Sequence, residues 1–164
     1  MQNVRWGTEK RMVACGLIAV AIATDVVLKM VARQMLPVGE HFAWGTRAGW
    51  VGFMPSTNEV LAFSLPIPNA VIWPVGVAVV IALIVHAVRR RMATGRFDVL
   101  LLAVILGAIS NLTERIALGG VTDYLSVTSM FPAFNIADLL IIGGVIGWWF
   151  ASYFQACNDP RRGV

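Results

Sequence analysis

The sequence predicts an integral membrane protein that is mainly α-helical, with four transmembrane helices and a small extramembrane β-like cradle on the outer face. The chain of 164 residues is 58% hydrophobic and only 13% charged, whereas a soluble domain is about half apolar and about a quarter charged. Its apolar residues form long runs that can each cross a bilayer, and its basic residues form short clusters beside those runs. The length suits a single membrane domain over residues 1–164.

The predicted spans are delimited by charged or turn-forming residues. A charged start before an apolar middle would also fit a cleavable export signal in the first run. The apolar pattern continues past Lys29 to Leu36, which favours a helix that stays in the membrane. The second run ends at the arginines of residues 89–91. The predicted spans cover residues 12–36, 69–88, 97–118 and 132–154.

The segment between the first two spans, residues 37–68, has a different composition. Glycines and prolines separate aromatic and β-branched residues there, and Trp44 and Trp50 are among them. This pattern indicates a few short strands or an ordered loop, and tryptophan is typical of the membrane–water interface. We therefore expect a cradle that lies on the bilayer surface.

The basic residues predict how the chain is oriented. Four spans place both termini on one side of the membrane, together with the arginine-rich link 89–96. The positive-inside rule assigns that side to the cytoplasm. The outer side receives residues 37–68 and 116–131, where Arg47 is the only basic residue. Basic clusters of this kind suit anionic headgroups, and they lack the broad basic face that nucleic acid requires.

Under this topology the polar residues of the apolar runs converge near the outer face. At about 1.5 Å per residue, Asp25 lies roughly 20 Å from the cytoplasmic end of its span. Within the spans, i, i+3 and i+4 spacings put several of these residues on shared helix faces and allow an ion pair between Asp25 and Lys29. The residues at this depth are Asp25, Lys29, Asn111, Glu114, Arg115, Asp123, Asn135 and Asp138.

Two of these acids, Asp123 and Asp138, are the candidate catalytic residues. Carboxyl groups that share one site do not both ionise easily. The ionised member can take a proton from water while the protonated member polarises a carbonyl. This is the chemistry of an aspartic peptidase, which needs no metal, cofactor or nucleophilic side chain. The two cysteines, Cys15 and Cys157, do not provide a disulfide framework or a metal site.

Five motifs then occur in a fixed order along nearly the whole chain. The most specific is FPAFNIAD at residues 131–138. In this order the motifs resemble those of the lipoprotein signal peptidases, also called signal peptidase II. The other four motifs are Thr24-Asp25…Lys29, Asn58…Ala62-Phe63-Ser64, Asn111…Arg115 and Val121-Thr122-Asp123-Tyr124.

The resemblance implies an enzyme of the bacterial cytoplasmic membrane that removes the signal peptide from diacylglyceryl-modified prolipoproteins. Asp123 and Asp138 match the positions of the family's two catalytic aspartates. The resemblance also implies contact with membrane lipids and sensitivity to globomycin-type cyclic peptides. Asp25 and Lys29 are expected to form a structural pair. The residues expected to bind substrate or to support the acids are Asn58, Asn111, Glu114, Arg115 and Asn135.

Two positions depart from the family's pattern. Glu114 stands where the family usually has an acid that is one methylene shorter, and Val60 stands where it usually has glycine. The link between Asp123 and Asp138 is also short for the family. These departures leave open a catalytically weak relative that binds lipidated peptides without cutting them.

Two further classes of function remain as alternatives. A serine–lysine peptidase would use Lys29 with Ser64 or Ser110, but it leaves both aspartates unexplained. A small proton-coupled membrane carrier would use intramembrane acids as a relay, and such a relay predicts acids at several depths.

Individual site residues also have simpler interpretations. Asp123 taken alone could be an acid in an exposed loop. Asp138 could be a carboxylate that interacts favourably with the positive end of the helix dipole at a helix N-terminus. Asn111 and Asn135 fit hydrogen bonds between helices. The catalytic interpretation depends on the two aspartates occurring together with the motif at residues 131–138.

Overall fold

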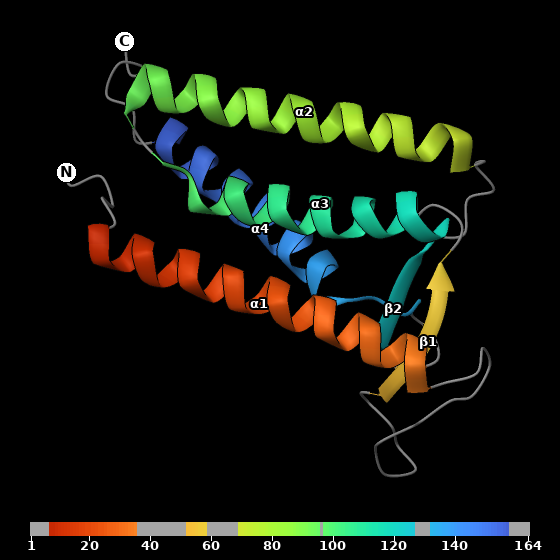
Figure 1. Ribbon diagram of the computed structural model, residues 1–164. Coiled ribbons are helices and arrows are strands. Elements are labelled where there is room, and N and C mark those ends of the chain that lie inside the picture. Colours follow the sequence, from red (N-terminus) through yellow and green to blue (C-terminus); the bar gives the residue numbers. More distant parts are fainter. Residues whose placement is uncertain (1–6, 36–51, 59–68, 96, 127–131, 158–164) are drawn as a thin grey trace.

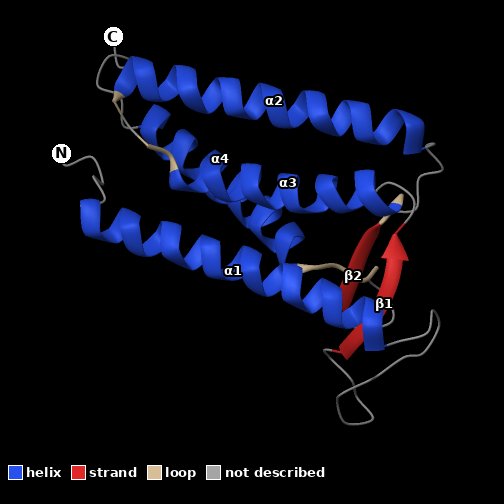
Figure 2. Ribbon diagram, viewed as in Figure 1, coloured by secondary structure: helices blue, strands red, loops and turns tan. Residues whose placement is uncertain are grey.

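The computed structural model describes residues 7–35, 52–58, 69–95, 97–126 and 132–157. Its helices are α1 (Thr8–Met35), α2 (Asn69–Thr94), α3 (Val99–Leu118) and α4 (Ile136–Cys157), and its strands are β1 (Gly52–Asn58) and β2 (Val121–Ser126). The helices run alongside one another and the strands lie at one end of the bundle (Figure 1). Figure 2 shows that both strands lie at one end of the helices, away from the other helix ends. All four helices are long and apolar enough to cross a membrane, which confirms the predicted class.

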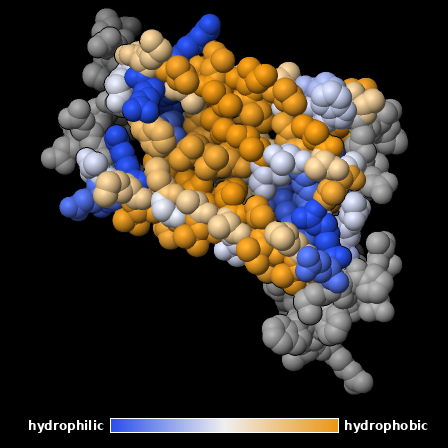
Figure 3. All heavy atoms as spheres, in the orientation of Figure 1, coloured by the Kyte–Doolittle hydropathy of each residue, from blue (hydrophilic) through white to orange (hydrophobic). Residues whose placement is uncertain are grey.

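The surface of the helices is apolar, as expected for a bundle solvated by lipid. Leu17, Val75 and Ile142 expose 65%, 56% and 56% of their surface, which would be unfavourable in water. Figure 3 shows hydrophobic side chains across the middle of the visible face, with hydrophilic ones gathered toward the helix ends. A bilayer would therefore cover the middle of the helices and leave the strands at one of its surfaces.

Helix α3 packs against all three other helices and most closely against α4. Glycines permit the close approach. A Cβ at Gly144 would lie 2.6 Å from Cγ2 of Val104, and one at Gly107 would lie 2.7 Å from the carbonyl oxygen of Ala137. Small residues at helix contacts are the usual way to pack helices in a membrane.

Both ends of α3 are capped by its own sequence. Asp98 accepts a hydrogen bond from the backbone N–H of Leu101 at 3.3 Å, as an N-cap residue does. Gly119 ends the helix with a left-handed conformation at φ 78°, which glycine adopts without strain. The chain then turns directly into β2. A Cβ at Gly120 would lie 2.9 Å from Cγ2 of Thr57, so this turn requires two glycines.

The sheet pairs two segments that are distant in the sequence. Strand β1 lies antiparallel to β2, with Ser56 opposite Asp123 and Asn58 opposite Val121, and the register shifts between Phe53 and Ser56. The prediction of strands within residues 37–68 is met by β1. Its partner lies in the link 116–131, where no strand was predicted, because an isolated six-residue strand has little local signature until a partner covers it.

The helix boundaries differ from the predicted spans. Helix α2 continues to Thr94 rather than ending at residue 88, because arginine is a good helix former and its charge marks only the edge of the apolar region. Helix α4 begins at Ile136 rather than at residue 132, because Phe134 pairs with Leu125 in an isolated bridge and Asn135 caps the helix. Helix α1 begins at Thr8 rather than at residue 12, and α3 begins at Val99 rather than at residue 97.

Candidate active site

Asp138 lies in the first turn of α4, where Asn135 holds it. The side-chain oxygen of Asn135 accepts a hydrogen bond from the backbone N–H of Asp138 at 2.9 Å. In return, the backbone N–H of Asn135 donates to Oδ2 of Asp138 at 3.2 Å. This reciprocal arrangement is a capping box. It fixes the rotamer of Asp138 and satisfies two backbone N–H donors at the helix start.

Asp123 approaches the same asparagine from β2. Nδ2 of Asn135 donates to Oδ1 of Asp123 at 2.7 Å, and Nδ2 of Asn58 on β1 donates to Oδ2 of Asp123 at 3.3 Å. Asn135 is fully buried and Asp123 is only 4% exposed. One asparagine therefore contacts both candidate catalytic acids, so the fold brings Asp123 and Asp138 together at one site.

The environment of Asp123 favours a protonated carboxyl. Burial, and next the nearby negative charge of Asp138, raise the pKa of Asp123 to about 7. The hydrogen bonds from Asn135 and Asn58 and the positive charge of Lys29 act in the opposite direction. Near neutral pH, a carboxyl with this pKa can donate or accept a proton.

A second asparagine, Asn111 on α3, orients Asp138 from the other side. Nδ2 of Asn111 donates to Oδ1 of Asp138 at 2.7 Å. The amide oxygen of Asn111 accepts from Nζ of Lys29 at 2.6 Å. An ammonium group can only donate, so Lys29 determines which way this amide points. The charge of Lys29 thus acts on Asp138 through Asn111.

Asp25 and Lys29 form the ion pair that their spacing allows, with Nζ 2.9 Å from Oδ2. Both side chains are almost completely buried. Oδ1 of Asp25 also accepts from the hydroxyl of Tyr124 at 3.0 Å and from the backbone N–H of Ala137 at 3.2 Å, and its Oδ2 accepts from Ser110 at 3.0 Å. Asp25 thereby joins α1 to α3, β2 and α4, in part through Tyr124 and Ala137, which are next to the candidate acids in the sequence.

Glu114 secures the start of β2 to the end of α3. Its carboxylate accepts from the backbone N–H of Thr122 at 3.1 Å and from the Thr122 hydroxyl at 2.8 Å. It also lies 3.4 Å from Nζ of Lys29 and 3.3 Å from a guanidinium nitrogen of Arg33. Glu114 is one methylene longer than the acid that the family usually has at this position, but both of its carboxylate oxygens have partners here. Arg115, the next residue, is half-buried in the last turn of α3.

Most of the predicted site residues therefore lie in one network: Asp25, Lys29, Asn58, Asn111, Glu114, Asp123, Asn135 and Asp138. The network also contains four residues that were not predicted as its members: Arg33, Ser110, Thr122 and Tyr124. Arg33 had a usable signal, because it follows Lys29 by four residues on the same face of α1. The others depend on contacts between distant segments. Among the described residues, no group of three or more histidine, cysteine or acidic side chains is placed to hold a metal ion.

Known proteins resemble this chain in sequence and in fold. Residues 17–154 match the family model described as signal peptidase (SPase) II. The lipoprotein signal peptidase of Dehalococcoides mccartyi is 31% identical over 140 residues, which cover 82% of this chain and 81% of that protein. That of Psychromonas ingrahamii is 30% identical over 155 residues, which cover 89% and 87%. A solved bacterial membrane enzyme superposes with a TM-score of 0.76 over 100% of this chain and 99% of its own, and at 19% identity this likeness shows a shared fold.

Proposed function

Because the chain belongs to the signal peptidase (SPase) II family, we propose that it is an aspartic endopeptidase that removes signal peptides from prolipoproteins. The observation that carries the proposal is the contact of Asn135 with both Asp123 and Asp138. This contact supports the proposal because two neighbouring carboxyl groups, one protonated and one ionised, can supply the acid and the base for peptide hydrolysis without a metal.

In the proposed reaction the acid pair carries one proton. The ionised carboxyl takes a proton from a water molecule, whose oxygen attacks the scissile carbonyl. The protonated carboxyl donates to the carbonyl oxygen, which gives a neutral tetrahedral diol. The protonated carboxyl then gives its proton to the leaving amide nitrogen as the C–N bond breaks, and the ionised carboxyl takes a proton from a diol hydroxyl, which forms the new carboxylic acid and restores the single shared proton. Because the two groups are coupled, the shared proton belongs to the pair rather than to one residue.

The position of the acids supports a lipid-modified substrate. Asp123 and Asp138 lie where the apolar helices end and the strands begin, so a peptide bond beside a membrane-anchored cysteine would reach them. The apolar walls of the bundle suit the signal helix and the diacylglyceryl chains. Globomycin-type cyclic peptides would compete at this site. Asn58 and Arg115 are proposed to contact the substrate or to position the groups that do.

The proposed location is the bacterial cytoplasmic membrane, with the acid pair at its outer face. Arg89, Arg90 and Arg91 lie at the bundle end opposite the strands. The positive-inside rule assigns that end and both termini to the cytoplasm. The whole chain is proposed to act as one membrane domain.

The contacts of Lys29 argue against a serine–lysine peptidase. Such an enzyme needs a neutral lysine as a base, whereas Lys29 is paired with Asp25 and Glu114. Ser110 donates to Asp25 rather than to Lys29. Ser64 and Val60 lie outside the described residues. A relay of acids through the membrane is also not favoured, since the buried acids Asp25, Glu114 and Asp123 gather near one end.

The test is cleavage of a purified diacylglyceryl-modified prolipoprotein by wild-type protein and by Asp123→Asn and Asp138→Asn. Each substitution keeps the side-chain shape and removes the ionisable group. We expect at least about a 10²–10⁴-fold loss of cleavage, the range that one acid–base group contributes. A gel shift between precursor and mature protein measures the loss. Globomycin should inhibit the wild type in the same assay.

The matched control is Glu9→Gln, which makes the same acid-to-amide change in the exposed first turn of α1 and should leave cleavage unchanged. Circular dichroism and elution volume in detergent show whether each variant is folded. Full activity of either aspartate variant would refute the acid pair. A folded wild type that binds but does not cut the substrate would support the binding-only relative instead, and Val60→Gly would be the first reversion to make.

A further inference from the structure

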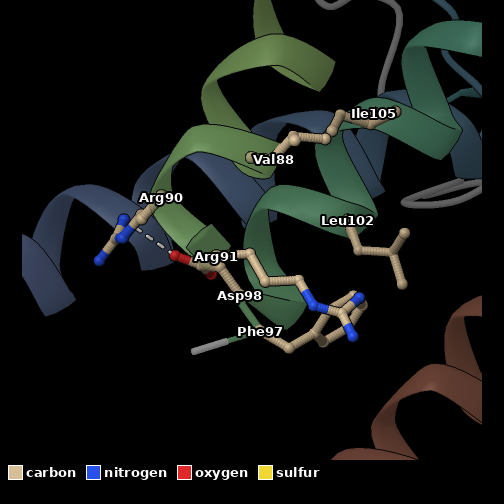
Figure 4. A pocket seen from close by; sticks show the side chains of 8 residues that line it. Val88, Arg90, Arg91, Phe97, Asp98, Leu102 and Ile105 are labelled. Carbon is tan, nitrogen blue, oxygen red and sulfur yellow. Dashed lines mark ion pairs between the residues drawn. The ribbon is translucent and has the colours of Figure 1, made fainter. Parts of the chain in front are cut away.

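At the bundle end opposite the acid pair, a small cavity lies between the end of α2 and the start of α3. Its volume is about 130 Å³. Figure 4 shows it from close by, with side chains of α2 on one side and of α3 on the other. The wall is mainly apolar and includes Ala87, Val88, Phe97, Leu102 and Ile105.

Two arginines are held at the rim of this cavity. Arg90 lies 3.0 Å from the carboxylate of Asp98, and its guanidinium stands 6.0 Å from the ring of Trp148 on α4. The guanidinium of Arg91 stands 5.9 Å from the ring of Phe97. Figure 4 shows Arg90 turned toward Asp98 and Arg91 extended alongside Phe97. Cation–π contacts of this kind hold a long side chain in place without neutralising its charge.

The charge at this rim is not balanced within the described residues. Arg89, Arg90 and Arg91 follow one another on α2, while Asp98 is the one acid that lines the cavity. The ion pairs of the described residues include Arg90 with Asp98 and none for Arg91. Among the described residues, a fixed cation beside an apolar cavity therefore has no anion to pair with.

The size and chemistry of the cavity define its occupant. A volume of about 130 Å³ is below the roughly 300–1,000 Å³ of sites that enclose a whole small ligand. The apolar wall excludes a free polar anion, but it suits one segment of a hydrocarbon chain. The cavity also lies at the point where the apolar part of α2 changes into arginines, which is where a bilayer changes from acyl chains into phosphates.

We propose that this cavity binds one anionic phospholipid of the surrounding bilayer, with a segment of acyl chain against Val88, Leu102 and Ile105. The lipid phosphate pairs with Arg91, and the excess positive charge of Arg89–Arg91 favours an anionic headgroup over a zwitterionic one. The site is separate from the acid pair, and its occupancy does not depend on peptide cleavage.

The experiment compares phosphatidylglycerol with phosphatidylcholine of the same acyl chains by native mass spectrometry of the detergent-solubilised protein. Three variants are tested beside the wild type. Arg91→Gln removes the phosphate partner. Leu102→Trp fills the cavity and keeps every charge. Arg11→Gln makes the same charge change at the cytoplasmic end of α1, away from the cavity.

We expect the wild type and Arg11→Gln to retain phosphatidylglycerol in preference to phosphatidylcholine. Arg91→Gln should lose about fivefold in that preference, which corresponds to about 1 kcal/mol per basic residue near an anionic surface. Leu102→Trp should reduce retention of both lipids. Equal binding of the two lipids by the wild type would overturn the proposal, as would unchanged preference in Arg91→Gln. The variant Asp138→Asn should keep the lipid, so that a failure of the proposed catalytic pair is distinguished from a failure of this site.

Discussion

Asn135 shows how much one uncharged side chain can determine. It caps α4, accepts from the backbone of Asp138 and donates to Asp123. Its side-chain oxygen and nitrogen therefore each form a hydrogen bond with one of the two candidate catalytic acids. Lys29 has a comparable role at longer range, because it orients the amide of Asn111, which in turn donates to Asp138. In each case a buried polar residue directs a hydrogen bond at an acid, which defines where the carboxylate oxygens lie.

The pKa of Asp123 sets the expected dependence of cleavage on pH. Burial and the charge of Asp138 raise that pKa to about 7, so the carboxyl keeps its proton up to that pH and loses it above. Because the proposed reaction needs one protonated and one ionised carboxyl, cleavage should fall on the order of tenfold between pH 7 and pH 8.5. A pH–rate profile under single-turnover conditions measures this fall in the cleavage rate.

The variant Asn58→Ala serves as the companion measurement. In the wild type, the hydrogen bond from Asn58 lowers the pKa of Asp123. Its removal should therefore shift the fall in cleavage at alkaline pH to a higher pH. The unfolding temperature must be followed from about pH 4 upward, because an acid with a raised folded-state pKa loses its contribution to stability as the pH rises from about 4 to about 7. Cleavage that stays level up to pH 9 would contradict the assignment of the shared proton.

At the scale of elements, the site depends on how closely α4 approaches α3. The glycines at this contact face Val104, Leu100 and the backbone of Ala137. This approach places the start of α4, with Asp138, beside the end of α3, with Asn111. The β1–β2 pair then closes the same end and brings Asn58 to Asp123. Two separate contacts between elements, that of α3 with α4 and that of β1 with β2, thus converge on the two acids.

Two neighbouring glycines of α4 test the close contact between helices. A Cβ at Gly144 would lie 2.6 Å from Val104 and 2.9 Å from the carbonyl oxygen of Leu100, whereas a Cβ at Gly143 would meet nothing within 4 Å. Gly144→Ala should therefore destabilise the fold by about 1–3 kcal/mol through overpacking. Gly143→Ala should be neutral or stabilise the helix slightly. Thermal unfolding in detergent compares the two variants, and an equal effect of both would show that this contact is looser than the structure indicates.

At the scale of the whole molecule, the membrane determines where chemistry can occur. The helices present apolar side chains to lipid along their middle part, while the acids, the strands and the polar network lie at one end. The arginines occupy the other end. Water that reaches the acids would therefore enter from the side of the strands, and the substrate would arrive sideways from the bilayer.

This arrangement predicts which residues a membrane-impermeant thiol reagent can reach. Cys157 is exposed at the end of α4 and, with Cys15 replaced by alanine, should be labelled only after spheroplasts are lysed. Ser56→Cys on the exposed part of β1, in a chain without other cysteines, should be labelled in intact spheroplasts. The reverse pattern would mean that the proposed orientation is inverted.

The sequence by itself determined the fold class, the approximate spans and the convergence of the polar residues. These depend on local composition and on the direction of each span, because a bilayer leaves long apolar helices as the main way to satisfy the backbone. Its order of motifs also indicated the family that the comparison then showed. The placement of Asp123 near Asp138 followed from the order of the spans, since one lies in the link between the last two spans and the other in the first turn of the last span.

The tertiary structure alone decided which partners each acid has. Tyr124 and Asp25 are separated by 99 positions in the sequence, and β1 meets β2 across two intervening helices. No periodicity or spacing encodes such contacts, because they depend on how closely helices approach and on which register two short strands adopt. The same reason explains why the hydrogen bonds of Thr122 to Glu114 and of Ser110 to Asp25 were not predicted. Their hydroxyl groups have no signal of their own until the fold places a carboxylate within hydrogen-bond distance.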